Sequence, residues 1–208
     1  MVKQVLKRIL PEKFVWWLGN TFPPKPFMYD IAQTERIIEY GWAYRNLPPT
    51  GTVLDVGASG SMFAHSLASM GYNVTTLDWK KPKSTHPNIC YIQKDLMLYN
   101  PLGKFDVVTC ISTLEHIALR VDWQKVVEKM LSFLQPDGIL LITVPCGFPK
   151  VLNGFKVFHP GSFKDCEYFK RLSKGVWVKT DLCWDLALHV NMQNKDEVTA
   201  ILCTKLYP

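Results

Sequence analysis

Short aliphatic runs alternate with longer stretches of helical periodicity from residue 50 onward, and this alternation restricts the fold more than any other feature of the sequence. Strands that alternate with helices predict βαβ units, whose strands form a parallel sheet with helices on both faces. The run at residues 105–111 is almost unbroken in its apolar character, which is typical of a central strand buried on both sides. The predicted strands are residues 52–56, 73–77, 89–92, 105–111 and 139–144, and the predicted helices among them are residues 63–70 and 122–134, the latter ended by a turn at 135–138.

The C-terminal part of the chain follows a different pattern. Residues 147–160 hold glycine, proline and aromatic residues without periodicity. We predict a helix at residues 162–172 and two strands at residues 176–182 and 197–204. The link between these two strands carries too few helix signals for a parallel crossover, so we expect them to pair antiparallel. The whole chain therefore predicts an α/β fold with a seven-stranded, mostly parallel sheet and an antiparallel last strand.

Charge and cysteine content narrow the range of partners. The net charge of +6 favours anionic partners, but no run of five or six basic residues appears, and this disfavours nucleic-acid binding. No cysteine pair forms a CxxC unit or a Cys/His cluster at zinc-ligand spacing, so we expect no zinc site. Several cysteines lie in or at the ends of apolar strand-like runs, where free cysteine behaves as a small hydrophobic residue, so we expect reduced thiols and a cytoplasmic location. The six cysteines are Cys90, Cys110, Cys146, Cys166, Cys183 and Cys203.

The first residues predict a helix with one apolar face. Val2, Val5, Leu6 and Ile9 recur at helical spacing, with basic residues elsewhere on the wheel. No stretch reaches the roughly 18 apolar residues that a membrane span needs. We favour a helix packed on the domain over a helix that lies at a membrane surface.

A glycine-rich turn follows the first predicted strand. Asp55 lies near the end of that strand, and the residues after it read Gly57-Ala58-Ser59-Gly60-Ser61. Such a turn lets backbone approach a ligand closely and presents free N–H groups to it. A nicotinamide dinucleotide site would need a G-x-G-x-x-G pattern, and Ser59 stands where its second glycine should be. Asp78 ends the second strand about twenty residues beyond the turn, where a carboxylate can accept both hydroxyls of a ribose.

Five motifs occur in a fixed order along the core of the chain. They read VLDVGASGS, TTLDW, QKDL, FDVVTCISTLEHI and LQPDGILLITVP. This ordered set resembles the class I S-adenosylmethionine-dependent methyltransferases, and most of all the group with an "LEH" segment after the fourth strand. The resemblance is strong over about residues 50–146 and looser beyond them. It implies a Rossmann-like three-layer sandwich and S-adenosylmethionine as the cofactor.

The resemblance also implies where the cofactor lies. The glycine-rich turn would pass under its methionine part, and an acid before the turn would hold the turn or the amino group. An acid after the second strand would bind the ribose, and the third and fourth strands would supply residues around the adenine, ribose and methionine. In chain order, the implied cofactor-binding residues are Asp55, Gly57, Ala58, Ser59, Gly60, Ser61, Asp78, Trp79, Asp95, Leu96, Ile111 and Ser112.

Three residues are candidates for catalysis. The resemblance places Glu115 and His116 at the lip where the methyl acceptor enters. A histidine there could take a proton from a hydroxyl or an amine, although it could equally do no more than bond to backbone, and Glu115 could cap the next segment. His159 lies on the variable segment after the fifth strand and is a second candidate base. Some relatives bind a divalent metal through E-x-x-E-H, but Ser112 replaces the first glutamate, so we expect no metal.

These observations predict one methyltransferase domain over residues 1–208. Residues 1–50 would form a helical cap, residues 51–146 the cofactor-binding core, and residues 147–208 an acceptor-side segment with a pair of strands. We expect methyl transfer to an oxygen or nitrogen of a small molecule or saccharide. The alternatives are a non-catalytic binding protein of the same fold, a methyltransferase for RNA or protein, and a nicotinamide-dependent oxidoreductase. The oligomeric state stays open.

Overall fold

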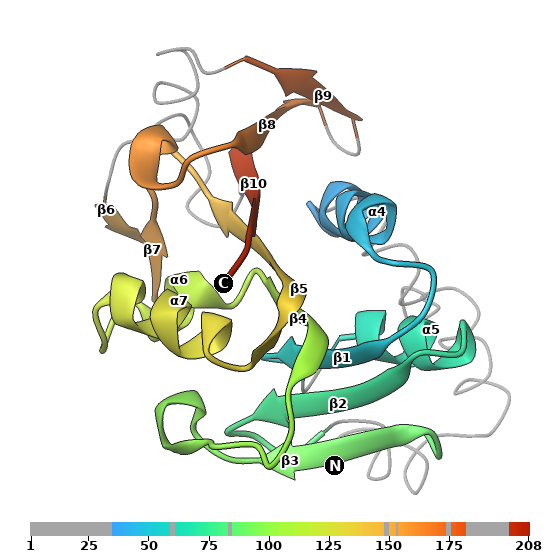
Figure 1. The fold of residues 1–208 in the computed structure, drawn as a ribbon. Coiled ribbons are helices and arrows are strands. Elements are labelled where there is room, and N and C mark those ends of the chain that lie inside the picture. The colour runs from blue at the N-terminus through green and yellow to red at the C-terminus, as the bar shows by residue number, and fades with distance from the viewer. Residues whose placement is uncertain are drawn as a thin grey trace, which may run out of the picture.

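The computed structural model describes residues 35–58, 61–82, 85–147, 150–152, 154–173, 176–181 and 200–208. Eight strands in these residues form one sheet, in the order β3-β2-β1-β4-β5-β10-β8-β9 (Figure 1), and β6 pairs with β7 in a separate hairpin. The helices are α4 (Arg36–Asn46), α5 (Phe63–Ser69), α6 (Leu114–Ile117) and α7 (Trp123–Leu131), with 3₁₀ turns η1 (Leu96–Leu98) and η2 (Pro160–Ser162). The strands are β1 (Thr52–Val56), β2 (Asn73–Asp78), β3 (Ile89–Gln93), β4 (Phe105–Ile111), β5 (Leu134–Pro145), β6 (Lys150–Leu152), β7 (Phe155–Val157), β8 (Cys166–Ser173), β9 (Val176–Thr180) and β10 (Ala200–Leu206).

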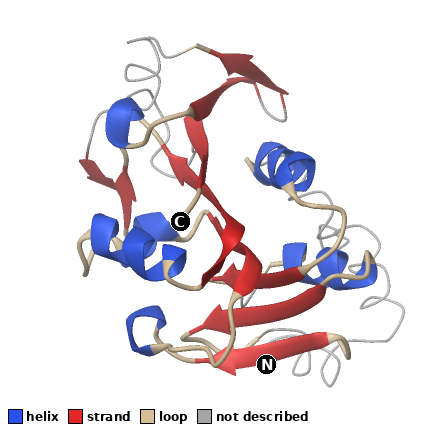
Figure 2. Cartoon of the chain, in the orientation of Figure 1, coloured by secondary structure: helices blue, strands red, loops and turns tan. Residues whose placement is uncertain are grey.

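The first five strands are parallel, and helices cover both of their faces (Figure 2). Neighbouring residues of a strand point to opposite faces, so Val53 packs in the core under α4 and α5, while Leu54 packs in the core under α7. Phe63 of α5 and Met130 of α7 are almost fully buried in these two cores. Each such side chain contributes about 1.5–3 kcal/mol to folding. The predicted α/β, Rossmann-like architecture is confirmed.

The C-terminal strands confirm one prediction and correct three. β10 runs antiparallel to β5, as expected of the last strand. The helix predicted at residues 162–172 is wrong, because most of that segment forms β8, which pairs antiparallel with β10 on one side and β9 on the other. Tyr168 and Phe169 enter the two opposite cores, an arrangement that suits aromatic residues in a strand. β8 thus separates β9 from β10, so the direct pairing expected between those strands is also wrong, and the sheet has eight strands instead of seven.

Two further differences lie around β5. The strand begins at Leu134, which pairs with Phe105, so the turn predicted at residues 135–138 belongs to the strand, with a register shift between Phe105 and Val107. The hairpin of β6 and β7 lies in a segment for which no regular structure was predicted. Backbone pairing between β4 and β5 in the one case, and between β6 and β7 in the other, decides these features, and local periodicity does not report it.

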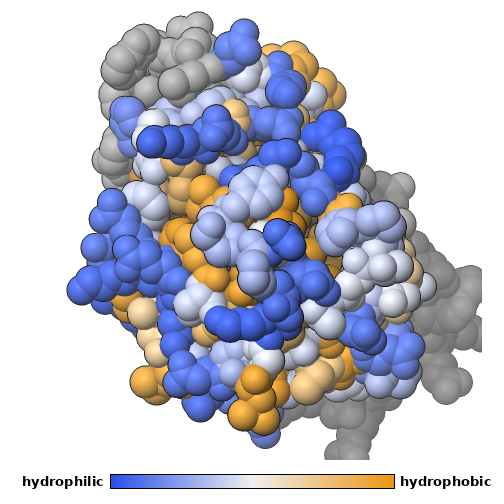
Figure 3. Space-filling model, viewed as in Figure 1, coloured by the Kyte–Doolittle hydropathy of each residue, from blue (hydrophilic) through white to orange (hydrophobic). Residues whose placement is uncertain are grey.

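The described part of the predicted cap is α4, and the amphipathic helix predicted at the start of the chain lies outside the described residues. Among the described helices, none combines the length and the apolar character that crossing a membrane requires. In the view of Figure 3, hydrophilic side chains cover most of the surface, and apolar ones gather near the middle of this face.

Candidate functional site

The glycine-rich turn packs tightly against the end of β4. Gly57 has a φ of +84°, and its N–H donates to the Leu77 carbonyl at 2.8 Å. A Cβ on Gly57 would lie 2.2 Å from Oγ1 of Thr113, so no side chain fits at this position. Ala58 is buried, while Ser59 and Gly60 lie outside the described residues. The turn therefore brings bare backbone to the carboxyl end of the sheet.

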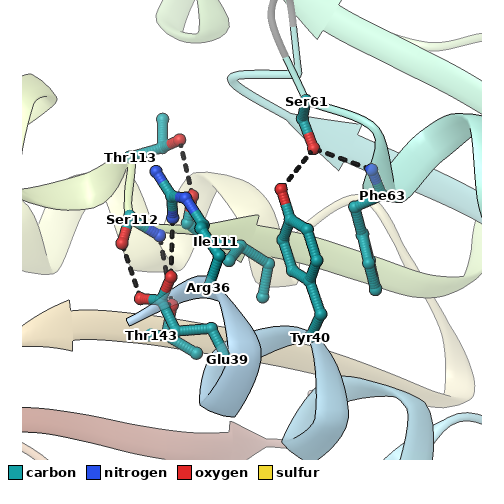
Figure 4. Close-up of polar contacts among 9 residues, drawn as sticks. All are labelled: Arg36, Glu39, Tyr40, Ser61, Phe63, Ile111, Ser112, Thr113 and Thr143. Atoms are coloured by element: carbon teal, nitrogen blue, oxygen red, sulfur yellow. Dashed lines mark hydrogen bonds and ion pairs between the residues drawn. The ribbon is translucent and has the colours of Figure 1, made fainter. Parts of the chain in front are cut away.

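Ser61 links this turn to two helices. Its hydroxyl accepts a hydrogen bond from the Phe63 N–H at 3.0 Å, and it lies 3.0 Å from the hydroxyl of Tyr40 in α4 (Figure 4). The Tyr40 ring also stacks on Phe63, with 5.1 Å between ring centroids. Helix α4 thus holds the start of α5 through both a polar and an aromatic contact.

Asp55 is buried immediately before the turn, with one oxygen unsatisfied. Its Oδ1 accepts a hydrogen bond from the Thr109 hydroxyl at 2.7 Å, whereas its buried Oδ2 has no hydrogen-bond partner among the described residues. Burial raises the pKa of Asp55 to about 7, against the lowering effects of the Thr109 bond and of the Arg36 charge. An unsatisfied buried acceptor is costly unless a donor reaches it, so this oxygen is suited to a ligand N–H group.

Asp78 and the residues near it lie at the carboxyl ends of β2 and β3. Asp78 is half-buried, and its Oδ1 accepts from the Lys80 N–H at 2.8 Å. Trp79 is 61% exposed, with Lys80 Nζ 5.0 Å and the Arg120 guanidinium carbon 5.7 Å from its ring centre. A cavity of about 200 Å³ is lined by Thr76, Asp78, Lys80, Pro82, Tyr91, Ile92 and Gln93.

The two implied cofactor-binding residues of the QKDL motif differ in burial. Asp95 is exposed, and its Oδ1 accepts from the Met97 N–H at 2.8 Å, which caps η1. Leu96 is buried. The capping role that the sequence left open for Asp95 is thus present in the structure, and it leaves the second carboxylate oxygen for other donors.

The exit of β4 is bound to α4 through a buried glutamate that the sequence reasoning missed. Glu39 is fully buried, and its Oε1 accepts from the hydroxyls of Ser112 at 2.5 Å and Thr143 at 2.7 Å. Its Oε2 lies 2.6 Å from an Arg36 nitrogen (Figure 4). Ser112 has a φ of +42°, which is rare for a residue with a side chain, and Ile111 beside it is buried. The available signal in the sequence was the helical spacing of Glu39, Trp42 and Ala43, which puts a glutamate on the same helix face as an aromatic residue. The structure buries all three.

Glu115 lies inside the protein and not at an open lip. It is 4% exposed, and its Oε2 has no hydrogen-bond partner within the described part of the chain. Burial raises the pKa of Glu115 to about 8, with further raising by Glu39 and Glu35 and lowering by its own backbone bond and by Arg36. The short helix α6 turns this side chain inward, so Glu115 lies with Glu35 and Glu39 in the field of the Arg36 guanidinium, which also acts on Asp55.

The two candidate histidines have opposite hydrogen-bond roles. Nδ1 of exposed His116 lies 2.9 Å from the Gly154 carbonyl oxygen, which can only accept, so Nδ1 is the donor. Nδ1 of exposed His159 accepts from the Gly161 N–H at 3.0 Å. In the neutral imidazole, His116 therefore has its lone pair on Nε2, whereas His159 has its proton there. Of these two neutral histidines, therefore, His116 is the one that can accept a proton at Nε2.

The aromatic side chains in and directly after β7 differ in burial. Phe158 is buried against Trp123 and Phe163, with ring centroids 5.7 Å and 6.0 Å away. Phe155 is half-buried and meets the His116 ring edge-on at 6.3 Å. Among the described residues, no group of three or more His, Cys, Asp or Glu side chains is arranged to hold a metal ion.

Replacing Glu115 with glutamine should flatten the dependence of stability on pH. Unfolded, this carboxyl ionises near pH 4.5, but folded it keeps its proton to about pH 8. Between these values the folded protein binds more protons than the unfolded chain, so its stability falls as pH rises. Asp55 acts in the same direction up to about pH 7. We expect Tm of the wild type to drop more than Tm of Glu115→Gln between pH 5 and pH 8.

Circular dichroism melts at the two pH values measure this difference. Glu128→Gln is the matched control, since Glu128 is exposed on α7. Equal pH slopes for the wild type and Glu115→Gln would show that Glu115 ionises normally in the folded protein.

Comparison with known proteins relates this chain to a family of methyltransferase domains. Residues 30–191 match the family model described as a methyltransferase domain. A ubiquinone biosynthesis O-methyltransferase of Rickettsia typhi is 32% identical over 151 residues, which cover 68% of this chain and 60% of that protein. A protein of the same name from Glaesserella parasuis is 30% identical over 106 residues, or 44% of each chain. The chain thus spans less than two thirds of the length of these relatives.

Two solved structures are similar in fold alone. Coclaurine N-methyltransferase, bound to N-methylheliamine and SAH, is 12% identical with a TM-score of 0.51, over 80% of this chain and 71% of that one. The glycopeptide N-methyltransferase MtfA is 12% identical with a TM-score of 0.50, over 96% of this chain and 100% of that one.

Proposed function

Because the chain belongs to the family of methyltransferase domains, we propose that it transfers the methyl group of S-adenosylmethionine to a hydroxyl oxygen of a small molecule. The observation that carries the choice of oxygen is the hydrogen bond from His116 Nδ1 to the Gly154 carbonyl, since it leaves Nε2 able to accept a proton. A hydroxyl needs such a base as its oxygen is methylated. The names of the curated relatives, which are O-methyltransferases, support the same choice.

The residues at the carboxyl end of the sheet fit this cofactor. Bare backbone at Gly57, where a Cβ has no room, suits the close approach of a ligand, and the unsatisfied Oδ2 of Asp55 suits the amino group of its methionine part. The positive charge of Arg36 lowers the pKa of Asp55. We therefore propose that the carboxylate of the methionine part lies on the Arg36 side of Asp55. The other residues proposed to hold the cofactor are Ala58, Ser59, Gly60, Ser61, Asp78, Trp79, Asp95, Leu96, Ile111 and Ser112.

The protein's own share of the reaction is alignment and proton removal. When bound, the cofactor supplies a methyl group already activated by its sulfonium. The chain has to hold the acceptor oxygen in line with that group and to accept the hydroxyl proton at His116 Nε2. Phe155 borders this imidazole and offers an apolar surface to the acceptor. Buried Glu115 and capping His159 are assigned no proton transfer with the acceptor.

Replacing Asp78 with alanine should weaken S-adenosylmethionine binding about tenfold or more. Each lost hydrogen bond to a charged carboxylate is worth about 1.5–3 kcal/mol, and tenfold in affinity corresponds to about 1.4 kcal/mol. Isothermal titration calorimetry with S-adenosylmethionine and, separately, NAD measures the effect. Asp78→Asn keeps an Oδ1 acceptor for the Lys80 N–H and should bind with intermediate affinity.

Asp137→Ala is the control for this experiment, because Asp137 is exposed near the amino end of β5. It should bind as the wild type does. Binding of NAD alone would favour the oxidoreductase, and binding of neither would favour a non-catalytic relative. Transfer from labelled S-adenosylmethionine to a panel of small alcohols and phenols, beside matched amines, then tests the acceptor atom. Salt-sensitive binding of a polyanion would instead point to RNA.

A further inference from the structure

We propose that the carbonyl group of Gly154, just before β7, holds His116 in the tautomer whose Nε2 atom accepts a proton, so that Gly154 is a positioning residue. Its catalytic significance rests on the proposed function, whereas the tautomer itself does not. The inference joins two segments 38 residues apart in the sequence, the LEH motif on α6 and the acceptor-side segment after β5.

The contact between the two segments sets the position of the imidazole proton. A free neutral imidazole can carry its proton on either nitrogen. At 2.9 Å from Nδ1, the Gly154 carbonyl oxygen stabilises the Nδ1–H form, because this oxygen has lone pairs and no proton. Among the described residues, Nε2 of His116 has no hydrogen-bond partner, and the side chain is exposed. The lone pair therefore faces outward, where an acceptor hydroxyl can reach it.

The hairpin is anchored to β5 at the end away from Gly154. Its strands pair antiparallel, with Leu152 opposite Phe155. After β7, the N–H of buried Phe158 donates to the Pro145 carbonyl, and the Gly147 N–H donates to the Phe158 carbonyl, both at 2.9 Å. These bonds tie the end of the hairpin to the end of β5. The ring of Phe155 limits the imidazole on a second side.

The backbone conformation of Gly154 directs its carbonyl group toward His116. Its φ is +86°, which L side chains rarely adopt, and a Cβ there would meet no atom within 4 Å. A side chain at this position is therefore disfavoured by backbone conformation alone. Gly71, between α5 and β2, has the same properties, with a φ of +94° and open space around its Cβ position. The two glycines form a matched pair for substitution.

The test is a ¹⁵N NMR measurement of the histidine rings in the full chain, about two pH units above the usual imidazole pKa of about 6.5. The chain has five histidines, and the signals lost in His116→Gln identify His116. We expect the wild type to show a protonated Nδ1 and an unprotonated Nε2. Gly154→Val should lower the ratio of this tautomer to the other about fivefold, as loss of one ordinary hydrogen bond would. Gly71→Val should leave the ratio unchanged.

A protonated Nε2 in the wild type would overturn the proposal, and so would an unchanged ratio in Gly154→Val. Gly154→Ala serves as a milder second variant, and thermal melts of each variant confirm that it is folded. Titration of the same samples with S-adenosylmethionine separates this inference from the proposed function. Failure of the wild type to bind the cofactor would count against the function, while the NMR spectra would still decide the tautomer.

Discussion

Replacing Glu39 with alanine should lower the free energy of unfolding by about 3 kcal/mol, the lower end of the usual cost of removing one partner of a buried ion pair, because the Arg36 side chain is 31% exposed. Glu39 is fully buried and accepts hydrogen bonds from Ser112 and Thr143, while Arg36 pairs with its second oxygen. Alanine would leave two hydroxyls and a guanidinium without this acceptor. Urea denaturation followed by circular dichroism measures the change.

Two further variants separate charge from burial at this site. Glu39→Gln keeps an oxygen acceptor of the same shape, so it should lose clearly less stability than Glu39→Ala. Glu128→Ala makes the same substitution at an exposed position of α7 and should shift stability by no more than about 0.5 kcal/mol. A Glu39→Ala protein as stable as Glu128→Ala would mean that the contacts of Glu39 contribute nothing measurable to the attachment of α4.

Replacing Gly57 with valine should weaken S-adenosylmethionine binding about 100-fold, which corresponds to about 2.7 kcal/mol. A Cβ at this position would lie 2.2 Å from Oγ1 and 2.3 Å from Cγ2 of Thr113, and the φ of +84° disfavours a β-branched residue as well. The turn therefore has to move away from the end of β4, together with the backbone proposed to lie under the cofactor. Calorimetric titration measures the affinity of the folded variant.

A second substitution tests whether the clash is the cause. All three atoms nearest to the Cβ position belong to the Thr113 side chain, so Thr113→Gly removes them. The double variant Gly57→Ala, Thr113→Gly should bind the cofactor more tightly than Gly57→Ala alone, although the positive φ still opposes alanine. Gly71→Val is the control for a strained turn far from the site. Equal affinities of the two Gly57→Ala proteins would contradict the steric explanation.

The parallel part of the sheet was predictable because each strand from β1 to β5 contains a local sequence signal. Its apolar run and the turn after it are contiguous, as at Gly57. β8 was predicted as a helix because its partners β9 and β10 supply the backbone bonds, and such pairing leaves no trace in local periodicity. Tertiary context overrode local propensity here.

The candidate site was predictable to a similar extent. The motifs identified the residues at the ends of β1, β2, β3 and β4, and the structure brings Asp55, Gly57 and Ser112 to one edge of the sheet. They did not identify Glu39, because its contacts with Ser112 and Thr143 span 73 and 104 residues. The roles of His116 and His159 could not be separated either, since the direction of each Nδ1 hydrogen bond depends on backbone groups that only the fold positions.

The place of β10 between β5 and β8 has a consequence for the order in which the chain acquires its structure during synthesis. On a ribosome, β5 and the β8–β9 hairpin emerge well before residues 200–206, which form β10. Without β10, β5 and β8 are not joined by hydrogen bonds, because each of them pairs with β10. Until it arrives, β5 has an open edge, which is where nascent sheets are prone to pair with other chains. The final closure of the sheet is thus a long-range event, and such contacts form slowly. A nascent chain stalled before residue 200 would have the parallel half of the sheet ready to form and the antiparallel half waiting for its central strand.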